Sequence, residues 1–269
     1  MTQLEGRVAI VTGASPNIGG TLARGLAEQG ARVVCTDLDP EVAEVCAGKI
    51  RSDGGDAIAV AGDVTDEAHA ADVVQQAVSR WGRLDVLVNN AVMFHQQGLF
   101  DMPLATYRRQ IDIILSGAFV FTRAAAGAMI EAGNGGSVIN VLSTAAWQGQ
   151  PGNIGYSTAK SGLINFTRSV AMELAEHRIR VNGLTPTATQ PADPEVARRA
   201  AEISARPNRW SMDFTAQFPM GRLPTTNDYV GAAVFLASDA SAMITGSNIT
   251  IDGGATAKYW PWTPHAGGS

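Results

Sequence analysis

Short apolar runs rich in β-branched residues alternate along this chain with longer segments in which apolar positions recur at helical spacing. The runs occupy residues 8–12, 31–36, 57–62, 84–90, 137–143, 179–184 and 248–252. Parallel strands need a long right-handed connection between neighbours, and a helix supplies it. The alternation therefore predicts an α/β fold, a doubly wound parallel sheet of about seven strands with helices on both faces.

Glycines mark the expected ends of several helices. Gly30, Gly82 and the cluster at 133–136 fall where a helix should stop before the next strand begins. Glycine enters the left-handed conformation at no steric cost, so these positions predict left-handed helix caps.

The alternation fails between Pro186 and Pro224. Prolines at 186, 191, 194, 207 and 219 bracket one short helical pattern around 194–205. An insertion this long in a compact domain is usually a lid or a binding loop. We therefore predict one domain over residues 1–269, with a substrate lid at 186–224 inside it.

Composition and charge narrow the class of protein. The 269 residues are 45% hydrophobic and 17% charged, with a formal net charge of -5, so nucleic acid is not an expected partner. Cys35 and Cys46 lack metal-ligand spacing and are expected to be reduced thiols. Because no apolar run approaches about 18 residues and no secretory leader is present, we expect a cytoplasmic protein without a membrane partner.

The sequence TGASPNIGG at residues 12–20 follows the first strand and opens a helical segment. A glycine-rich turn at this place holds the pyrophosphate of a dinucleotide at a helix N-terminus. The spacing T-G-x-x-x-G-x-G finds two of its glycines, but Asn17 stands where the middle one is expected. Because Asn enters the left-handed region at low cost, we expect Asn17 to adopt it and the turn to bind a cofactor. The predicted cofactor contacts are Gly13, Ser15, Asn17, Ile18 and Gly19.

The end of the second strand indicates which dinucleotide binds. VVCTDLD places Asp37 where its carboxylate can accept hydrogen bonds from both adenosine ribose hydroxyls. The same charge would repel a 2′-phosphate, and no Lys or Arg at 13–23 or at 38 would compensate it. We therefore predict NAD rather than NADP.

Tyr156 and Lys160 stand four residues apart in YSTAK, within a helical segment at 154–176. Residues at this spacing share one face of a helix. A cation beside a phenol favours the phenolate and lowers the pKa of the tyrosine, which suits proton exchange with an alcohol oxygen. Ser143, at the end of the fifth strand, could hydrogen-bond that oxygen as charge develops on it.

With these motifs, the chain resembles a short-chain dehydrogenase/reductase of the compact single-domain form over residues 5–254. The resemblance implies a Rossmann-like fold and carries over Ser143, Tyr156 and Lys160 as catalytic residues, with Ser143 13 positions before Tyr156 as the family pattern requires. It implies that Tyr156 is the general acid/base, that Ser143 binds the substrate oxygen, and that Lys160 tunes Tyr156 and binds the nicotinamide ribose. With Tyr156 and Lys160, the further cofactor contacts that it implies are Asp63, Val64, Asn90, Ala91, Pro186 and Thr187.

The sequence departs from the family pattern at three more places. Val92 replaces the glycine of N-N-A-G, and Thr187 replaces the glycine of a P-G step after the sixth strand. Ile114 stands where the family has a fourth catalytic residue, an asparagine. The two branched side chains narrow the floor of the site, and the isoleucine removes a polar group from the proton path.

Substrate contacts are expected from strand ends and from the loops that follow them. Most candidates are apolar or aromatic, a composition equally typical of core or lid packing. We see no metal-ligand cluster in the sequence. The residues predicted to contact substrate are Phe94, His95, Trp147, Asn153 and Trp210.

These observations favour an NAD-dependent oxidoreductase that interconverts a secondary alcohol and a ketone of apolar alicyclic or aromatic character. A sugar or hydroxy-acid dehydrogenase is the alternative within the enzymes, and a non-catalytic nucleotide-binding regulatory protein is the alternative outside them. An enoyl reductase is disfavoured, because resemblance to that relative requires a longer spacing from Tyr to Lys. By resemblance to the family, we expect a homotetramer.

Overall fold

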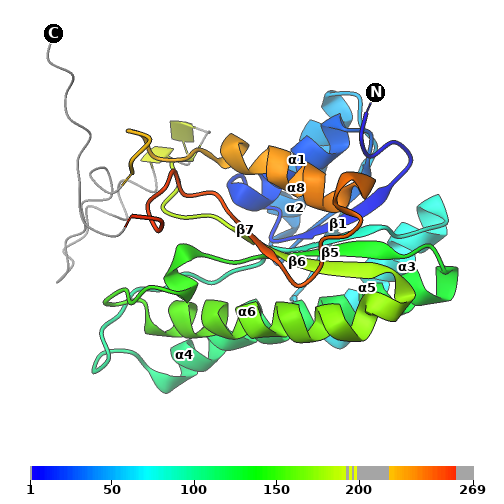
Figure 1. Ribbon diagram of the computed structural model, residues 1–269. Coiled ribbons are helices and arrows are strands. Elements are labelled where there is room, and N and C mark those ends of the chain that lie inside the picture. Colours follow the sequence, from blue (N-terminus) through cyan, green and yellow to red (C-terminus); the bar gives the residue numbers. More distant parts are fainter. Residues whose placement is uncertain (1, 192–193, 196, 199–217, 259–269) are drawn as a thin grey trace, which may run out of the picture.

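The structure, a computed structural model, is built on one parallel sheet of seven strands in the order β3-β2-β1-β4-β5-β6-β7 (Figure 1). It describes residues 2–191, 194–195, 197–198 and 218–258. The predicted α/β fold is confirmed, because every predicted run overlaps a strand. The strands are β1 (Val8–Thr12), β2 (Arg32–Asp37), β3 (Ala57–Ala61), β4 (Val86–Asn89), β5 (Gly136–Val141), β6 (Ile179–Thr185) and β7 (Asn248–Thr250).

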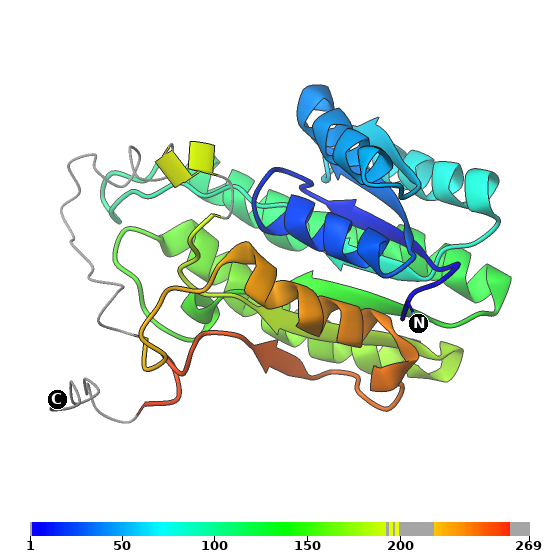
Figure 2. The same cartoon turned by 90° about the horizontal axis from the view of Figure 1, so that it is seen from above.

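Helices cover both faces of the sheet. In Figure 1, α1, α2 and α8 lie above the sheet, and α3, α4, α5 and α6 lie below it. Figure 2 shows α1 and α8 side by side, and a side-chain carbon added at Gly25 would come within 2.3 Å of Val230. The helices are α1 (Ile18–Glu28), α2 (Pro40–Ser52), α3 (Glu67–Trp81), α4 (Leu104–Ile111), α5 (Gly117–Ala132), α6 (Ile154–Leu174) and α8 (Val230–Ala237).

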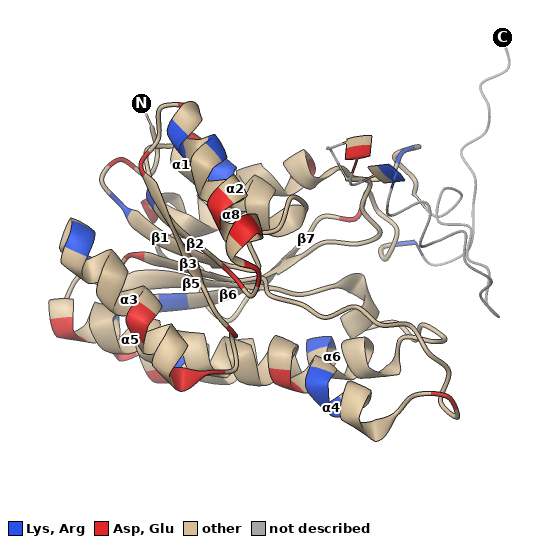
Figure 3. Ribbon diagram, turned by 180° about the vertical axis from the view of Figure 1, so that it is seen from behind, with Lys and Arg blue, Asp and Glu red and all other residues tan. Residues whose placement is uncertain are grey.

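The two faces of the sheet bury separate apolar clusters. The cluster under α1, α2 and α8 includes Leu22 and Leu26, and the cluster under α3 and α5 includes Val73 and Phe121. Cys35 and Cys46 are free and buried in the first of these clusters. Charged residues of both signs lie on the helices and loops of both layers (Figure 3). The strands are therefore apolar on both faces, which explains why they read as runs in the sequence.

The strand order reverses between β1 and β4. In an open α/β sheet, ligands bind beyond the carboxyl ends of the strands at such a switch point. The segments that follow β1, β2, β4, β5 and β6 all begin at this edge, and they contain nearly all of the residues predicted to form the site.

The left-handed glycine caps are confirmed. Gly82 ends α3 with φ 77° and Gly133 ends α5 with φ 67°. Gly30, one residue beyond the cap of α1, has φ 92°. Each glycine lets the chain turn directly from its helix into the next strand.

One long helical segment, Leu104–Ala132, joins α4 to α5 through a π-helical turn, η1 (Asp112–Ser116). Among the described residues it alone is long and apolar enough to cross a membrane, but half of its most apolar window is buried inside the molecule. Residues of α5 pack on the sheet in the cluster with Val73 and Phe121. This packing accounts for its apolar character.

The predicted lid segment, residues 186–224, begins and ends at neighbouring points of the structure. Gln190 N–H donates to the carbonyl of Pro224 over 2.8 Å, so the two ends of the 186–224 segment lie together. Residues 194–195 and 197–198 are helical, within the short helix predicted around 194–205. Trp210, predicted to contact substrate, lies outside the described residues.

Candidate active site

The glycine turn between β1 and α1 packs tightly against the end of β4. A side-chain carbon added at Gly13 would come within 2.7 Å of the Ala91 Cα, and one added at Gly19 would come within 2.0 Å of the Gly13 carbonyl oxygen. Gly13 also has φ 65°, which disfavours any other residue. The turn is thus a cradle that a single extra carbon would fill, as close approach to a pyrophosphate requires.

Asn90 and Thr12 fasten this turn to the sheet. The Asn90 side-chain amide donates to the carbonyls of Thr12, over 3.1 Å, and Gly13, over 2.8 Å. The Thr12 hydroxyl in turn accepts from the backbone N–H groups of Asn90 and Ala91, over 3.0 and 3.1 Å. Asn90 and Ala91, predicted to contact the cofactor, therefore lie beside Gly13.

Asn17 does not take the left-handed conformation predicted for it. Its φ and ψ are both -136°, and it is the N-cap of α1. An N-cap residue joins the helix with negative φ, so this position makes no demand for a glycine. The side chain is exposed at the mouth of the turn, with Ser15 and Ile18 partly exposed beside it.

Asp37 ends β2 and is half-buried. Its Oδ1 accepts a hydrogen bond from the Asp39 backbone N–H over 3.2 Å, and burial raises the pKa of the carboxyl group. No cation is among the groups that shift this pKa. The carboxylate has oxygens that can accept hydrogen bonds from ribose hydroxyls, and no described cation pairs with it.

Asp63 and Val64 follow β3 at the same edge of the sheet. Asp63 accepts hydrogen bonds from the backbone N–H and the hydroxyl of Thr65, over 2.9 and 2.8 Å, and pairs with Arg109 of α4. Burial by itself raises the pKa of Asp63, but these contacts together outweigh it and lower the pKa. Val64 is buried, and a side-chain carbon added at Gly117 would lie 2.9 Å from it. The segment predicted to lie beside adenine is thus held by the long helical segment Leu104–Ala132.

Ser143, Tyr156 and Lys160 come together beyond β5. Ser143 precedes the short 3-10 helix η2 (Thr144–Ala146), where its hydroxyl accepts from the Ala145 backbone N–H over 3.2 Å. Tyr156 and Lys160 lie on one face of α6, and the Lys160 Nζ is 5.7 Å from the Tyr156 ring centroid. The Lys160 Nζ also donates to the carbonyl oxygen of Val141 at the end of β5.

The protonation of the pair differs from the expectation. Burial raises the pKa of Tyr156, opposed by a hydrogen bond with the Ser143 hydroxyl, whereas a lowered value was predicted. Lys160 is only 3% exposed, and burial lowers its pKa to about 7. The buried ammonium is directed at a carbonyl, and its own charged form is disfavoured, so it does not outweigh the burial of the phenol.

Ile114 lies inside the π-helical turn and is buried with Ala118, Leu142, Ala159 and Leu163. Tyr156 packs against this cluster. The side chain is therefore part of an apolar contact between η1 and α6, at the place where the family pattern has a polar residue.

Phe94 is the aromatic side chain that packs against Tyr156. Phe94 is 54% exposed, and its ring centroid lies 5.2 Å from that of Tyr156 at an interplanar angle of 80°. His95 is exposed in the same loop. Trp147 and Val92 are also exposed, at the ends of the segments that follow β5 and β4.

The remaining predicted contacts, Pro186 and Thr187 to the cofactor and Asn153 to the substrate, lie in two different places. Pro186 and Thr187 join the end of β6 to the segment after Ser143, because the Pro186 carbonyl accepts from Thr144 N–H and the hydroxyls of Thr187 and Thr144 are 3.1 Å apart. Asn153, predicted to contact substrate, is fully buried, and its side-chain amide donates to Gln150 over 2.7 Å. With no accessible surface, Asn153 supports the loops and is not positioned to contact a substrate.

Comparison with known proteins places this geometry in a family. A family model described as enoyl-(acyl carrier protein) reductase matches residues 13–256. The chain belongs to the short-chain dehydrogenase/reductase family. It is 39% identical over 93% of its length to the cis-4-hydroxycyclohexanecarboxylate dehydrogenase of Sinomonas cyclohexanicum and covers 97% of that protein. It is 36% identical over 94% of its length to the L-rhamnose 1-dehydrogenase (NAD(P)(+)) of a Sphingomonas species and covers 98% of it.

Solved structures of this family superpose over nearly the whole chain. A gluconate 5-dehydrogenase from Burkholderia cenocepacia, in complex with NADP and tartrate, matches with a TM-score of 0.84 and 32% identity, covering 96% of this chain and 98% of that one. The chain is therefore an oxidoreductase of the short-chain dehydrogenase/reductase family, with its Rossmann-like fold. Among the residues that the structure describes, no group of three His, Cys, Asp or Glu side chains could hold a metal ion.

Three residues at the site were not singled out from the sequence. Thr12 was recognised only as part of the turn, Arg109 gave no signal beyond its charge, and Gln110 stands on the apolar face of a helix. A polar residue four positions before Ile114, on the face that packs against α6, is a signal that could have identified Gln110.

Proposed function

We propose that this chain is an NAD-dependent dehydrogenase that interconverts a secondary alcohol and its ketone, with an apolar alicyclic or aromatic group beside the reacting carbon. The observation that carries the proposal is the meeting of Ser143, Tyr156 and Lys160 beyond β5, at the same carboxyl edge of the sheet as the glycine turn after β1. A phenol, a hydroxyl and a buried amine at this edge are the groups that alcohol oxidation requires.

The roles of the three side chains follow from their surroundings. Tyr156 exchanges a proton with the alcohol or carbonyl oxygen, and the hydroxyl of Ser143 donates a hydrogen bond to the same oxygen. Burial keeps the Tyr156 phenol protonated, which suits proton donation to a ketone. Lys160 has a pKa of about 7, so its amine gains or loses a proton readily near neutral pH.

The described residues fit a dinucleotide. Gly13 and Gly19 form a cradle without room for a side chain, and Asp37 offers its carboxylate to the adenosine ribose. When bound, NAD supplies the hydride acceptor, or NADH the hydride donor. The relatives include one enzyme named for NAD(P)(+) and one in complex with NADP, so the preference for NAD rests on Asp37.

The apolar substrate class rests on Phe94 beside Tyr156 and on other exposed apolar side chains in the segments after β4 and β5. Phe94 packs edge-on against the phenol with half of its surface exposed, and Trp147 and Val92 present further apolar surface. A ring of alicyclic or aromatic carbon would cover this surface, and about 25 cal/mol would be gained per Å² buried. The Sinomonas relative is named for an alicyclic hydroxy acid, which agrees with this class.

A sugar or hydroxy-acid dehydrogenase is the second candidate. Two relatives favour it, since one is named for L-rhamnose and the other for gluconate. His95 and Gln96 are exposed in the loop after β4 and could bind substrate hydroxyls. Neither candidate requires the enoyl reductase activity in the description of the family model, and the spacing of four from Tyr156 to Lys160 disfavours that activity.

Turnover with NAD⁺ over a panel of alcohols tests both candidates. The panel is cyclohexanol, 1-phenylethanol, cis-4-hydroxycyclohexanecarboxylate, L-rhamnose and D-gluconate, with the absorbance of NADH as the readout. We expect the highest kcat/KM with one of the first three. A higher value with L-rhamnose or D-gluconate would select the second candidate, and NADH binding without turnover of any alcohol or ketone would favour a non-catalytic protein.

A further inference from the structure

Gln110 is a fully buried polar residue at the end of α4. None of its surface is exposed, and its side-chain amide donates to the carbonyl oxygens of Met93, over 3.2 Å, and His95, over 3.3 Å. These carbonyls belong to the residues on either side of Phe94. One buried amide therefore holds the backbone on both sides of Phe94.

The other end of the same amide lies against α6. A side-chain carbon added at Gly155 would come within 2.2 Å of the Gln110 Oε1, so the two segments are in close contact one residue before Tyr156. This oxygen has no hydrogen-bond partner among the described residues. An amide with one unpaired end is costly to bury, so packing alone does not explain a glutamine here.

A second attachment fixes the far end of the loop. Gln97 N–H donates to the carbonyl of Gly152 over 2.8 Å, and Gln97 pairs with Asn153 in a short parallel bridge. The loop from Met93 to Gln97 is thus tied to α4 at one end and to the start of α6 at the other. Phe94 lies between these two attachments.

Phe94 is the residue that this arrangement presents to the site. It is the aromatic neighbour of Tyr156, with the two ring centroids 5.2 Å apart and the rings at 80°. Edge-on aromatic pairs contribute about 0.5 to 1.5 kcal/mol, too little to hold a loop residue in one place by themselves. The position of the ring depends on the backbone that carries it, and so on Gln110.

We infer that Gln110 is a positioning residue: by holding the carbonyls on both sides of Phe94, it fixes the Phe94 ring against Tyr156 and thereby sets which alcohols reach the phenol. The inference rests on the proposed function, because it takes Tyr156 as the proton-exchanging group. It assigns to Gln110 a role in substrate selection without contact with substrate.

Kinetics with two alcohols of different size test this role. Gln110→Met keeps the length of the side chain and removes the donor, and Phe94→Ala removes the ring. For each single variant we expect the ratio of kcat/KM for cyclohexanol to that for propan-2-ol to fall at least about fivefold, with the NADH Kd within about twofold of wild type. In the double variant this ratio should fall no further than in Phe94→Ala alone, because Gln110 acts through that ring.

The matched control is Gln75→Leu, a loss of a similar amide from the exposed surface of α3, which should leave the ratio unchanged. Additive effects in the double variant, or an unchanged ratio in a Gln110→Met protein that binds NADH, would overturn the inference. If Gln110→Met fails to fold, Gly155→Ala takes its place, because the added carbon would displace the same amide.

Hydrogen exchange separates a failure of this inference from a failure of the proposed function. Mass spectrometry of the backbone amides of residues 92–99 needs no substrate. We expect faster exchange of this loop in Gln110→Met and no change in Gln75→Leu. If neither alcohol is turned over but the loop exchanges faster, the proposed substrate class fails and the attachment by Gln110 stands; unchanged exchange overturns the inference whatever the substrate.

Discussion

Lys160 is buried and Tyr156 is partly buried beside it, and burial shifts the pKa values of the two groups in opposite directions. The pKa of the phenol rises and that of the amine falls to about 7, because burial disfavours the charged form of each group. Both side chains can therefore be neutral near pH 7. Lys160, with its pKa near the working pH, can change protonation with small changes in local charge, which is useful for passing a proton on from Tyr156.

The first prediction concerns Tyr156→Phe, which removes the phenolic proton and keeps the ring. General acid/base catalysis contributes about 10²- to 10⁴-fold, so turnover should fall by at least this factor while the NADH Kd stays within a few-fold. Steady-state rates and NADH fluorescence titration measure the two quantities. Tyr107→Phe, on α4, is the control, and activity within tenfold of wild type in Tyr156→Phe would remove Tyr156 from the proposed role.

The second prediction follows from the lowered pKa of Lys160. From pH 7 to the ordinary lysine value of 10.5, the unfolded chain binds a proton that the folded chain does not, so the free energy of unfolding rises with pH through this window. Below pH 7 the destabilisation is complete. Lys160→Met should therefore be more stable than wild type at pH 6, by about 2 to 4 kcal/mol, with the difference shrinking towards pH 10.

Urea unfolding of both proteins at pH 6 and pH 9 measures this difference. Other titrating groups contribute equally to the two proteins, so the difference between them isolates Lys160. If Lys160→Met were more stable than wild type by the same free energy at both pH values, the pKa of Lys160 would not be lowered in the folded protein.

The third prediction is that Asp37 sets the choice of cofactor. Asp37→Ala removes a carboxylate that would repel a 2′-phosphate and that binds the ribose hydroxyls of NAD. Loss of those hydrogen bonds should weaken NAD by about 1 to 3 kcal/mol, and relief of the repulsion should improve NADP. The ratio of kcat/KM for the two cofactors should fall, and an unchanged ratio would argue against this role. Asp39→Ala, two residues after β2, is the control.

At the scale of elements, the sequence predicted the strands well because parallel strands are buried on both faces. Val8–Thr12 and the other strands appear as continuous apolar runs, and their ends differ from the predicted ones by only a few residues. The conformations of single residues were harder to predict. Asn17 was expected to be left-handed because only its residue type was known, whereas its place as the N-cap of α1 decides its conformation.

The π-helical turn at Asp112–Ser116 was not predicted, since nothing in DIILS distinguishes it from an ordinary helix. Ile114 within this turn packs against Ala159 and Leu163 of α6, a contact that exists only in the folded chain. The burial of Gln110 and Asn153 likewise depends on loops that meet only in the folded chain. The residues of the site could thus be named from motifs, but the residues that support them could not.

The fourth prediction belongs to this turn. Ile114 packs against α6 near Tyr156 but has no donor or acceptor, so we predict that protons leave Lys160 through waters on main-chain carbonyls or ribose hydroxyls. Ile114→Asn should cost about 1 to 3 kcal/mol of stability, because a buried amide replaces an apolar side chain. Its activity should be equal or higher.

The solvent deuterium isotope effect on kcat is the measurement for both proteins. A smaller effect in Ile114→Asn would support a rebuilt proton path. If this variant folds and binds NADH but loses turnover tenfold or more, the prediction is wrong and the apolar side chain itself shapes the site. Ile113→Asn, the adjacent partly buried residue, is the control.

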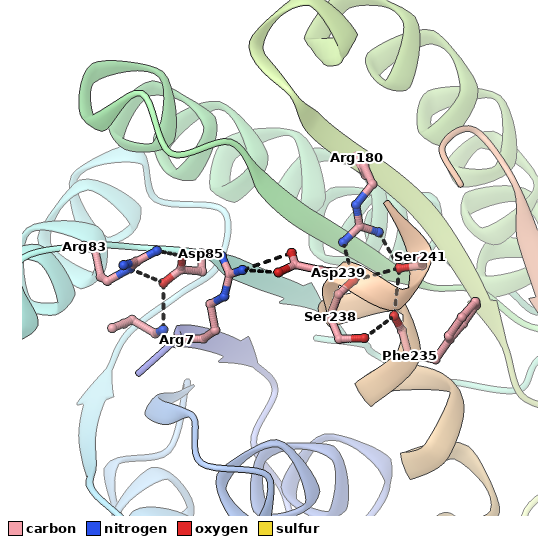
Figure 4. Close-up of polar contacts among 9 residues, drawn as sticks. Arg7, Arg83, Asp85, Arg180, Phe235, Ser238, Asp239 and Ser241 are labelled. Carbon is pink, nitrogen blue, oxygen red and sulfur yellow. Dashed lines mark hydrogen bonds and ion pairs between the residues drawn. The ribbon is translucent and has the colours of Figure 1, made fainter. Parts of the chain in front are cut away.

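At the scale of the whole molecule, a network of charges ties the first strand to the last helix at the edge opposite the site (Figure 4). Arg7, just before β1, bonds Asp85, just before β4, over 3.1 Å and Asp239, just after α8, over 2.9 Å. Arg83 pairs with Asp85 as well, and Asp85 accepts from the buried Val8 N–H over 2.9 Å. Asp85 is 2% exposed on its side chain and Asp239 is 85% exposed, so the same arginine has one buried and one exposed partner.

The last prediction uses this difference to test whether the chain unfolds as one domain, which stays a prediction alongside the homotetramer. Asp85→Asn leaves two arginines facing an uncharged amide and should lower the free energy of unfolding by about 2 to 4 kcal/mol. Asp239→Asn breaks an exposed pair with the same Arg7 and should cost at most about 1 kcal/mol. In urea, fluorescence and circular dichroism should give one coincident transition that shifts as a whole in Asp85→Asn, with kcat unchanged in the folded protein, because the network lies at the opposite edge from Tyr156. Two separate transitions, only one of them shifted, would show that the strands near Asp85 and the segments around the site belong to different folding units.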